Sequence, residues 1–282
     1  SGNLSSHLLA VAQACKALAA QPFDPAPATH AAALAQARLA TSSRFPAQRE
    51  AAATLHPWWQ TDLTDTLASA RRDAQAASGG QALATALRLQ ALAEQLEALA
   101  WEANFTFLYH SKRHLLHIGY RVDDHVLDTA FYDLLASEAR LATFVLIAQG
   151  HLGQEHWFAL GRLLTSTTGT PALLSWSGSM FEYLMPLLVM PTYEHTLLDQ
   201  TYRSVVRRQI AYGRQRGVPW GISESGYNTV DLHFNYQYRA FGVPGLGLKR
   251  GLAEDLVVAP YASALALMVA PEEACRNLQR LD

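Results

Sequence analysis

The chain has 282 residues, 50% of them hydrophobic and only 16% charged, which is enough apolar material for a sizeable core. Its 22 Lys and Arg and 24 Asp and Glu give a net charge of −2 at pH 7, and the basic residues form no stripe along the sequence. We therefore exclude nucleic-acid binding.

The two cysteines, Cys15 and Cys275, lie far apart without metal-type spacing, which fits a reducing compartment. The histidines also lack the spacing of a zinc site, and no phosphate loop or dinucleotide motif is present. We therefore expect neither a metal nor a cofactor. No apolar run approaches the roughly 20 residues that span a bilayer, and the first residues do not resemble a signal peptide.

Residues 1–100 are rich in Ala and Leu with short Pro or Gly breaks, which predicts a string of helices. Near the end of this segment Leu89, Leu92, Leu96 and Leu99 recur at spacings of three and four, which predicts one apolar stripe on a helix that packs against others. No catalytic cluster is found in this segment. We interpret it as a connector or support.

The later part of the chain, 101–282, begins with a pattern typical of a β-hairpin, in which the apolar segments 105–109 and 115–120 flank a polar break. Helices are predicted at about 128–149, 155–163, 179–190, 196–216 and 260–270. A connection rich in Gly, Pro and aromatic residues covers 218–251. No run of strands alternates with the helices, so the fold class is mostly α.

Two acidic residues fall on the predicted helix 128–149, which Asp128 would begin as the N-cap. Glu138 lies two turns after Phe131 on the apolar stripe, where an ionised group is costly without partners. It therefore has either a function or a structural pairing with an arginine. Asp133 lies on another face and aligns with Arg140, which predicts a structural pair, with a contact to substrate as the alternative.

A third acid, Glu224, lies in a loop with two glycines and two serines between Trp220 and Tyr227. The flat apolar faces of these rings suit the stacking of pyranose rings, so the loop has the composition of a carbohydrate site. A solvated loop acid is the alternative.

The fourth candidate, Glu182, forms a capping box with Ser179, and this structural role explains it fully. We keep it as a secondary candidate because the preceding loop, with Trp176, resembles the lining of a sugar site. Further along, Tyr236 and Arg239 offer groups for sugar hydroxyls, although packing in the core would also account for such aromatic residues.

The stretch from about 107 to 281 resembles the glucoamylase-like central domain of cyclic β-1,2-glucan synthases. The likeness is carried by the segments 132–140, 154–158, 174–186, 219–225 and 238–251. The segment 1–100 is similar to the connector that precedes this domain. The resemblance, shared with endo-β-1,2-glucanases, implies that 101–282 is the N-terminal part of an (α/α)6 toroid, incomplete in this chain and open on an apolar side.

In that family a membrane-embedded glycosyltransferase builds linear β-1,2-glucan, and the central domain cleaves the chain and joins its ends with retention. The resemblance implies this activity on β-1,2-glucan at the cytoplasmic face of the bacterial inner membrane, together with the remaining domains of the synthase. It carries the acid of the Ser-Glu-Ala-Arg motif to Glu138, which we assign as general acid/base. It carries the acid of the Ile-Ser-Glu-Ser motif to Glu224, which we assign as nucleophile.

The remaining site candidates are assigned to substrate binding: Asp133, Trp176, Glu182, Trp220, Tyr227, Tyr236 and Arg239. We expect Glu138 and Glu224 to face one cavity lined by Trp176 or Trp220. Retention requires their carboxyl groups to lie about 5–5.5 Å apart. Two rival functions stay open, an endo-β-1,2-glucanase that uses water as acceptor and a non-catalytic module that binds glycan or acts as a scaffold.

Overall fold

A computed structural model gives the fold and describes residues 2–21, 24, 26–42, 58–75, 81–166 and 169–281. Two compact units make up the chain: Val11–Ala98, and Ser1–Ala10 together with Leu99–Asp282. The division lies near the change in composition, but the first ten residues belong to the larger unit. This arrangement differs from a segment 1–100 that stands by itself.

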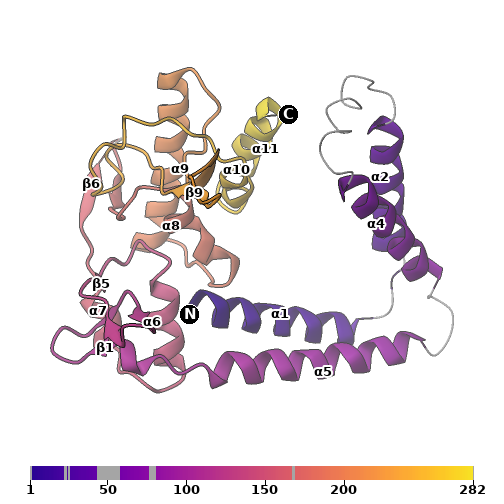
Figure 1. The fold of residues 1–282 in the computed structure, drawn as a ribbon, viewed down its shortest axis with the longest axis horizontal. Coiled ribbons are helices and arrows are strands. Elements are labelled where there is room, and N and C mark those ends of the chain that lie inside the picture. The colour runs from indigo at the N-terminus through magenta and orange to yellow at the C-terminus, as the bar shows by residue number, and fades with distance from the viewer. Residues whose placement is uncertain are drawn as a thin grey trace. The chain divides into compact units, whose positions relative to one another are not determined.

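The first hundred residues form helices wherever the structure describes them, as their composition predicts. These helices are α1 (Gly2–Ala20), α2 (Ala26–Ser42), α4 (Trp58–Gln75) and α5 (Gln81–Glu102). Helices α1 and α5 run side by side around a small core of Ala12, Cys15 and Ala93 (Figure 1). Leu89 and Leu96 of the predicted stripe pack on this core, but Leu92 and Leu99 are exposed.

The predicted hairpin is confirmed, with shorter strands than expected. Strands β1 (Tyr109–His110), β2 (Leu115–His117) and β5 (Phe131–Tyr132) form an antiparallel sheet in the order β1-β2-β5, after a 3-10 turn η1 (Thr106–Leu108). Tyr109 pairs with Leu116. A second ribbon pairs β3 (Tyr120–Arg121) with β4 (Val126–Leu127).

The predicted helix 128–149 is wrong over its first half, since α6 covers only Arg140–Ala148. Asp128 does not cap a helix: its Oδ1 accepts a hydrogen bond from the Ala130 amide at 2.9 Å, in a turn that leads into β5. Phe131 and Tyr132 then pair with β2, because an aromatic pair at a sheet edge is at least as well placed in a strand as in a helix. Glu138 therefore lies in the turn that precedes α6.

Of the other predicted helices, 196–216 is confirmed by α9 (Leu197–Arg216), with Thr196 as its N-cap and Gly217 at φ 70° beyond its last residue. The remaining predicted helices are shorter than expected: α7 (Glu155–Ala159), α8 (Met180–Leu184) followed by η2 (Met185–Leu188), and α10 (Tyr261–Ala266). Helix α11 (Pro271–Leu281) was not predicted. Two more hairpins pair β6 (Leu164–Ser166) with β7 (Pro171–Leu173) and β8 (Ser225–Val230) with β9 (Tyr236–Arg239).

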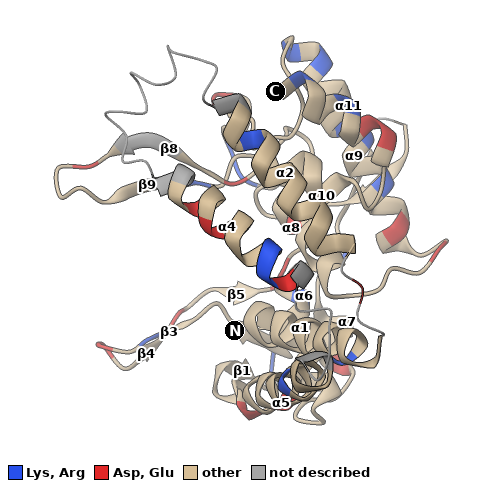
Figure 2. Ribbon diagram, turned by 90° about the vertical axis from the view of Figure 1, so that its right-hand side faces the viewer, with Lys and Arg blue, Asp and Glu red and all other residues tan. Residues whose placement is uncertain are grey.

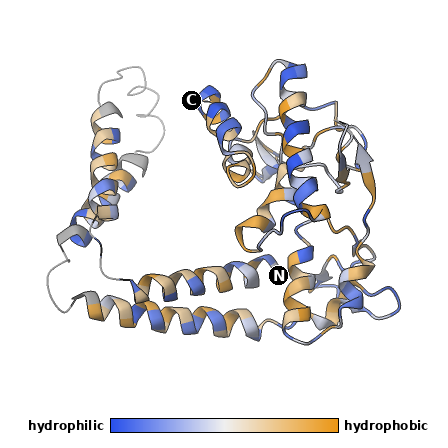
Figure 3. Ribbon diagram, turned by 180° about the vertical axis from the view of Figure 1, so that it is seen from behind, coloured by the Kyte–Doolittle hydropathy of each residue, from blue (hydrophilic) through white to orange (hydrophobic). Residues whose placement is uncertain are grey.

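Over its described residues the chain is mostly helical with small antiparallel sheets, as predicted. The main core of the larger unit joins α8, α9, α10 and β7. Val205, Tyr183 and Leu173 are fully buried there. Helix α11 is largely hydrophilic (Figure 3), although Ala274 and Asn277 on one side of it are buried. Helix α4 carries both acidic and basic residues (Figure 2), and α11 carries acidic residues in its first turn and a basic residue in its last.

Candidate active site

The turn that carries Glu138 is fixed by a buried arginine, Arg140, which is 1% exposed. Its guanidinium donates to the carbonyl oxygens of Ser137 and Tyr183, each at 3.0 Å, and to the Tyr202 hydroxyl at 3.0 Å. The guanidinium is therefore occupied by carbonyl and hydroxyl acceptors. The predicted pair between Asp133 and Arg140 is wrong, because the helix that would have aligned them does not form.

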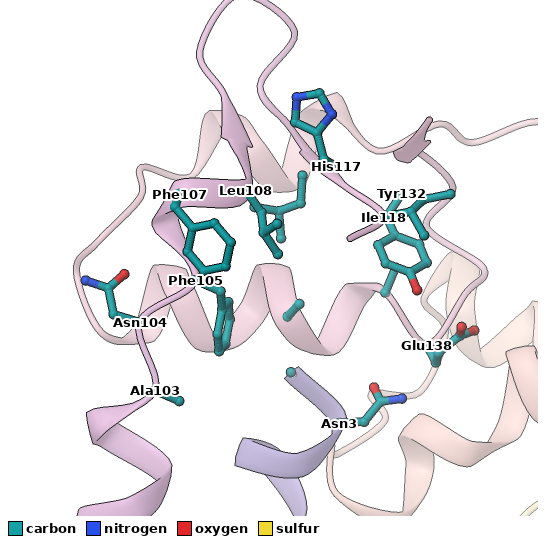
Figure 4. Close-up of a pocket in the computed structure, with 14 residues that line it drawn as sticks. Asn3, Ala103, Asn104, Phe105, Phe107, Leu108, His117, Ile118, Tyr132 and Glu138 are labelled. Atoms are coloured by element: carbon teal, nitrogen blue, oxygen red, sulfur yellow. The ribbon is translucent and has the colours of Figure 1, made fainter. Parts of the chain in front are cut away.

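Glu138 lines a cavity of about 380 Å³ within the larger unit. Figure 4 shows the Tyr132 hydroxyl and the Asn3 amide at the end of this cavity where Glu138 lies, with Phe105 and Phe107 toward the other end. The Ser137 hydroxyl donates to Glu138 Oε2 at 3.2 Å. Burial is the main reason that the pKa of Glu138 is raised, and the Glu182 carboxylate adds to the rise.

Glu182 is the N3 residue of the predicted capping box, which is confirmed: the Ser179 hydroxyl accepts from the Glu182 amide, and the Glu182 carboxylate accepts from the Ser179 amide. The same carboxylate has a wider role than capping. It also accepts from the hydroxyls of Ser175 and Ser177 and from the amides of Trp176 and Ser177. A 5% exposed carboxylate with this many donors holds the loop 175–179 in place.

This loop lies directly against the glycine-rich segment 242–249. The backbone amide of Leu248 donates to the Ser175 carbonyl at 3.1 Å, and the backbone amide of Lys249 donates to the Trp176 carbonyl at 2.9 Å. A Cβ at Gly242 or at Gly247 would overlap the backbone of Ser177. The glycines of this segment therefore allow two backbones to approach closely.

Trp176 is half-exposed at the outer end of the same loop, and its Nε1 donates to Asp133 Oδ1 at 3.0 Å. Asp133 thus contacts a candidate sugar-binding ring instead of an arginine. Asp133 and Trp176, both predicted to bind substrate, are therefore neighbours. The Trp176 amide donates to Glu182, which holds the loop 175–179 in place.

Glu224 lies on a short segment that is held on both sides. Gln209 of α9 exchanges two hydrogen bonds with the backbone of Ile222, each at 2.8 Å, and the Ser223 hydroxyl accepts from the Phe181 amide at 3.0 Å. Tyr261 donates to the Glu224 carbonyl at 2.8 Å. The backbone of Glu224 is thereby placed beside the N-terminus of α8.

The two carboxylate oxygens of Glu224 have different hydroxyl donors. Ser179 donates to Oε1 at 3.5 Å, and Tyr238 donates to Oε2. Burial, followed by the Glu138 and Glu182 carboxylates, raises the pKa of Glu224 from 4.5 to about 7. A substantial share of this group is therefore protonated near neutral pH.

Glu138 acts electrostatically on Glu224, and both glutamates act on the same tyrosine, Tyr132. Besides burial, the two carboxylates both raise the pKa of Tyr132, and the Glu138 carboxylate raises that of Glu224. Glu224 also shares the Ser179 hydroxyl with Glu182, so these two acids from distant parts of the sequence lie beside one another.

The two glutamates do not share a hollow lined by tryptophan. Glu224 lines a second hollow of about 510 Å³, with Tyr236 and Tyr238, and among the described residues neither tryptophan lines this hollow or the cavity of Glu138. Trp220 is 5% exposed and belongs to the main core, because Gly213 of α9 leaves room for it. The expectation that Trp220 offers a face to sugar is therefore wrong.

The remaining candidates lie on the β8–β9 hairpin. Tyr236 is 68% exposed, and Arg239 forms an ion pair with Asp255 at 2.5 Å. The side chain of Tyr227 lies outside the described residues. Sequence reasoning missed Tyr238 and Tyr132 as neighbours of the glutamates, although the alternation Tyr-Gln-Tyr before Arg239 is a signal that could have placed Tyr238 on the face of Tyr236.

The described residues contain no group of three or more His, Cys, Asp or Glu that could hold a metal ion. Likewise, none of the helices within the described segments is long and apolar enough to cross a membrane.

Residues 131–282 match the model of the Glycoamylase family, which carries the description "Putative glucoamylase". This match covers more than half of the chain, and the chain belongs to that family. The chain is also similar to the cyclic beta-(1,2)-glucan synthase NdvB of Rhizobium meliloti (strain 1021), with 53% identity over 194 residues. That match covers 69% of this chain and 7% of the relative, so the chain spans a small part of that protein's length. The resemblance seen in the sequence motifs is thereby confirmed.

Proposed function

We propose that this chain processes β-1,2-glucan by retaining transglycosylation, with Glu138 and Glu224 as the reacting carboxyl pair. The proposal is carried by the placement of Glu224, which shares the Ser179 hydroxyl with Glu182 and whose pKa Glu138 raises, in a chain that is 53% identical to a cyclic beta-(1,2)-glucan synthase over 194 residues. Hydrolysis or transfer of a glycosidic bond requires one protonated and one ionised carboxyl, a state that repulsion between two close acids favours.

In the first step, Glu224 attacks the anomeric carbon, and the glycosidic bond breaks as Glu138 gives its proton to the leaving oxygen. The glycosyl unit is then held as an ester of Glu224. In the second step, a glucan hydroxyl attacks the same carbon and passes its proton to the Glu138 carboxylate, while the ester bond breaks and frees Glu224. Attack from the far end of the same chain closes a ring.

Hydrogen bonding supports this order of roles. Hydroxyls of Ser179 and Tyr238 donate to the two oxygens of Glu224, and donors of this kind stabilise and orient a carboxylate nucleophile. Glu138 accepts from one side-chain hydroxyl, that of Ser137. Burial raises the pKa of both carboxyls, so the roles are assigned from the hydroxyl donors and not from burial. The working state is the one in which the pair holds a single proton.

The surrounding architecture belongs to the same proposal. We infer that the helices beyond Leu99 are inner and outer helices of an incomplete (α/α)6 toroid and that the chain works beside further domains of a membrane-associated synthase. The exposed apolar residues on the β8–β9 hairpin, among them Leu232 and Phe234, fit a side of the toroid that other segments complete.

The test is product analysis on linear β-1,2-glucan with the full-length protein. Cyclic products, and early products with the β configuration by NMR, are expected. Glu138→Gln and Glu224→Gln should each lower the rate by about 10³-fold or more, because each removes a group that acts only in the transition state. The exposed Glu272→Gln serves as the matched control and should leave the rate unchanged.

Short linear products with retained configuration would replace transfer by hydrolysis. Products of inverted configuration would overturn the assignment of Glu224 as nucleophile. Glucan binding that survives both substitutions, with no turnover in the parent protein, would support a non-catalytic binding module.

A further inference from the structure

The face of the β8–β9 hairpin that continues from Glu224 carries two exposed tyrosines. Tyr236 and Tyr238 alternate with half-buried residues along β9, so both side chains lie on one face. They are 68% and 56% exposed, and both line the hollow of about 510 Å³ that contains Glu224. This face is therefore open to a ligand that also reaches Glu224.

The opposite strand places a glycine, Gly226, beside this face. Gly226 pairs directly with Tyr238 in the register of the hairpin, and a Cβ at Gly226 would overlap the Tyr236 hydroxyl. The Tyr236 phenol therefore lies across the position of Gly226. A larger residue there would force the ring away from its present place.

The two tyrosines occupy different backbone positions along β9, of which that of Tyr238 is next to Glu224. Tyr238 donates to Glu224 and so lies beside the sugar that Glu224 attacks. Tyr236 is two residues further along β9, and two residues of a strand advance by roughly 6.6 Å. A glucan that enters from Glu224 would meet Tyr236 one sugar unit later.

We propose that Tyr236, with Gly226 beneath it, forms a subsite for the second glucosyl unit of the donor chain, counted from the bond that breaks. The inference rests on the proposed function and adds the position at which the chain is held. All ring C–H bonds of a β-glucopyranose are axial, so both of its faces are apolar and stack on an aromatic ring, while its hydroxyls can bond to the phenols. The continuity of this face with Glu224 identifies the occupant as the glucan itself.

The experiment compares 4-nitrophenyl β-glycosides that carry one, two and three β-1,2-linked glucosyl units, with the full-length protein. In the parent protein, kcat/KM should rise when the second unit is added, because that unit gains the stacking contact. Tyr236→Ala should shrink this rise about tenfold, measured as the ratio of kcat/KM for the two-unit donor to that for the one-unit donor. Tyr236→Phe, which keeps the ring, should retain most of the rise.

Two further variants make the test specific. Gly226→Ala should reproduce the effect of Tyr236→Ala, because it displaces the ring without removing it. Tyr193→Ala is the matched control, since Tyr193 is 67% exposed and precedes α9, away from this face in the sequence; it should behave as the parent.

An equal loss on all three donors, or no loss on any, would overturn the subsite while the proposed function stands. A change of oligomeric state without a change in donor preference would make this face a protein contact and also overturn it. A parent protein that releases no nitrophenol from any donor would remove the proposed function and the subsite together.

Discussion

Two carboxylates that meet at Ser179 have opposite surroundings. In the loop 175–182, the Glu182 carboxylate is 5% exposed and accepts from serine hydroxyls and backbone amides around it. In the segment 223–239, Glu224 is half-buried, has a hydroxyl donor on each oxygen and borders an open hollow. A single hydroxyl, that of Ser179, lies within 3.3 Å of Glu182 and 3.5 Å of Glu224.

The contrast shows how burial alone fails to identify a reactive acid. Glu182 is the more buried residue, but its lone pairs are taken by fixed donors, so a substrate atom has no place to approach. Glu224 keeps acceptor capacity on the side of the hollow, and its raised pKa records incomplete solvation without full compensation. Because one serine proton cannot serve both carboxylates at once, Ser179 also couples the structural acid to the reactive one.

The largest expected effect on stability follows from Glu182→Gln. The amide NH2 would face hydroxyls and amides that already donate to this position, which leaves buried donors unpaired. We expect the free energy of unfolding to fall by about 3 kcal/mol. Urea denaturation at neutral pH measures this loss.

Glu224→Gln in the same experiment sharpens the comparison. It should leave the free energy of unfolding unchanged or slightly higher at neutral pH while it abolishes turnover. Equal losses of stability in the two variants would contradict the division between a structural and a reactive acid. Glu272→Gln, on an exposed turn of α11, should change stability by less than about 0.5 kcal/mol.

The free energy of unfolding should depend on pH through Glu224. The pKa of Glu224 is raised from 4.5 to about 7, chiefly by burial, so the folded protein binds this proton more tightly than the unfolded chain does. Its stabilising contribution is therefore complete below about pH 4.5 and is lost as the pH rises through about 7. After allowance for the solvent that reaches this half-buried group, we expect a loss of about 1–2 kcal/mol.

Urea unfolding of the parent and of Glu224→Gln at pH 5 and pH 8 isolates this contribution. The parent should lose more stability than the variant over this interval, because the glutamine does not titrate. A parent and a variant with the same change would mean that the Glu224 carboxylate is as well solvated in the folded protein as in the unfolded chain.

Local sequence signals predicted those elements whose ends are set by residues next to them in the chain. The range 196–216 and the Ser179–Glu182 capping box were predicted, and in the structure Thr196 and Gly217 lie at the two ends of α9, because caps satisfy backbone groups within one turn. The same reasoning failed at 128–139, where an apolar period fitted a helix but pairing with β2 prevailed. Periodicity cannot register a partner strand that lies elsewhere in the sequence.

The candidate site shows the same limit. Glu138 and Glu224 could be singled out because an acid among apolar or aromatic residues needs an explanation, and the motif resemblance pointed to the same two positions. The burial of Trp220 could not be predicted, since it depends on the space that Gly213 leaves on α9. The link between Tyr238 and Glu224 depends on the register of the hairpin, which the residues between its strands do not reveal.

The smallest expected effect concerns Trp176, which contacts both the structural acid Glu182 and the candidate substrate-binding residue Asp133. The Trp176 amide donates to Glu182. Its half-exposed ring donates from Nε1 to Asp133 at 3.0 Å. Trp176→Phe removes the second bond and keeps most of the ring. An exposed hydrogen bond to a carboxylate contributes little, so we expect a loss of about 0.5 kcal/mol and a rate within about threefold of the parent. Trp176→Ala should leave stability near that of Trp176→Phe and lower turnover by a further factor of about ten if the ring stacks on sugar.

A double-mutant cycle of Trp176→Phe with Asp133→Asn should give a coupling below about 1 kcal/mol. A coupling of 2 kcal/mol or more would place Asp133 and Trp176 with Glu182 in the structural region, and it would remove both from the substrate-binding surface.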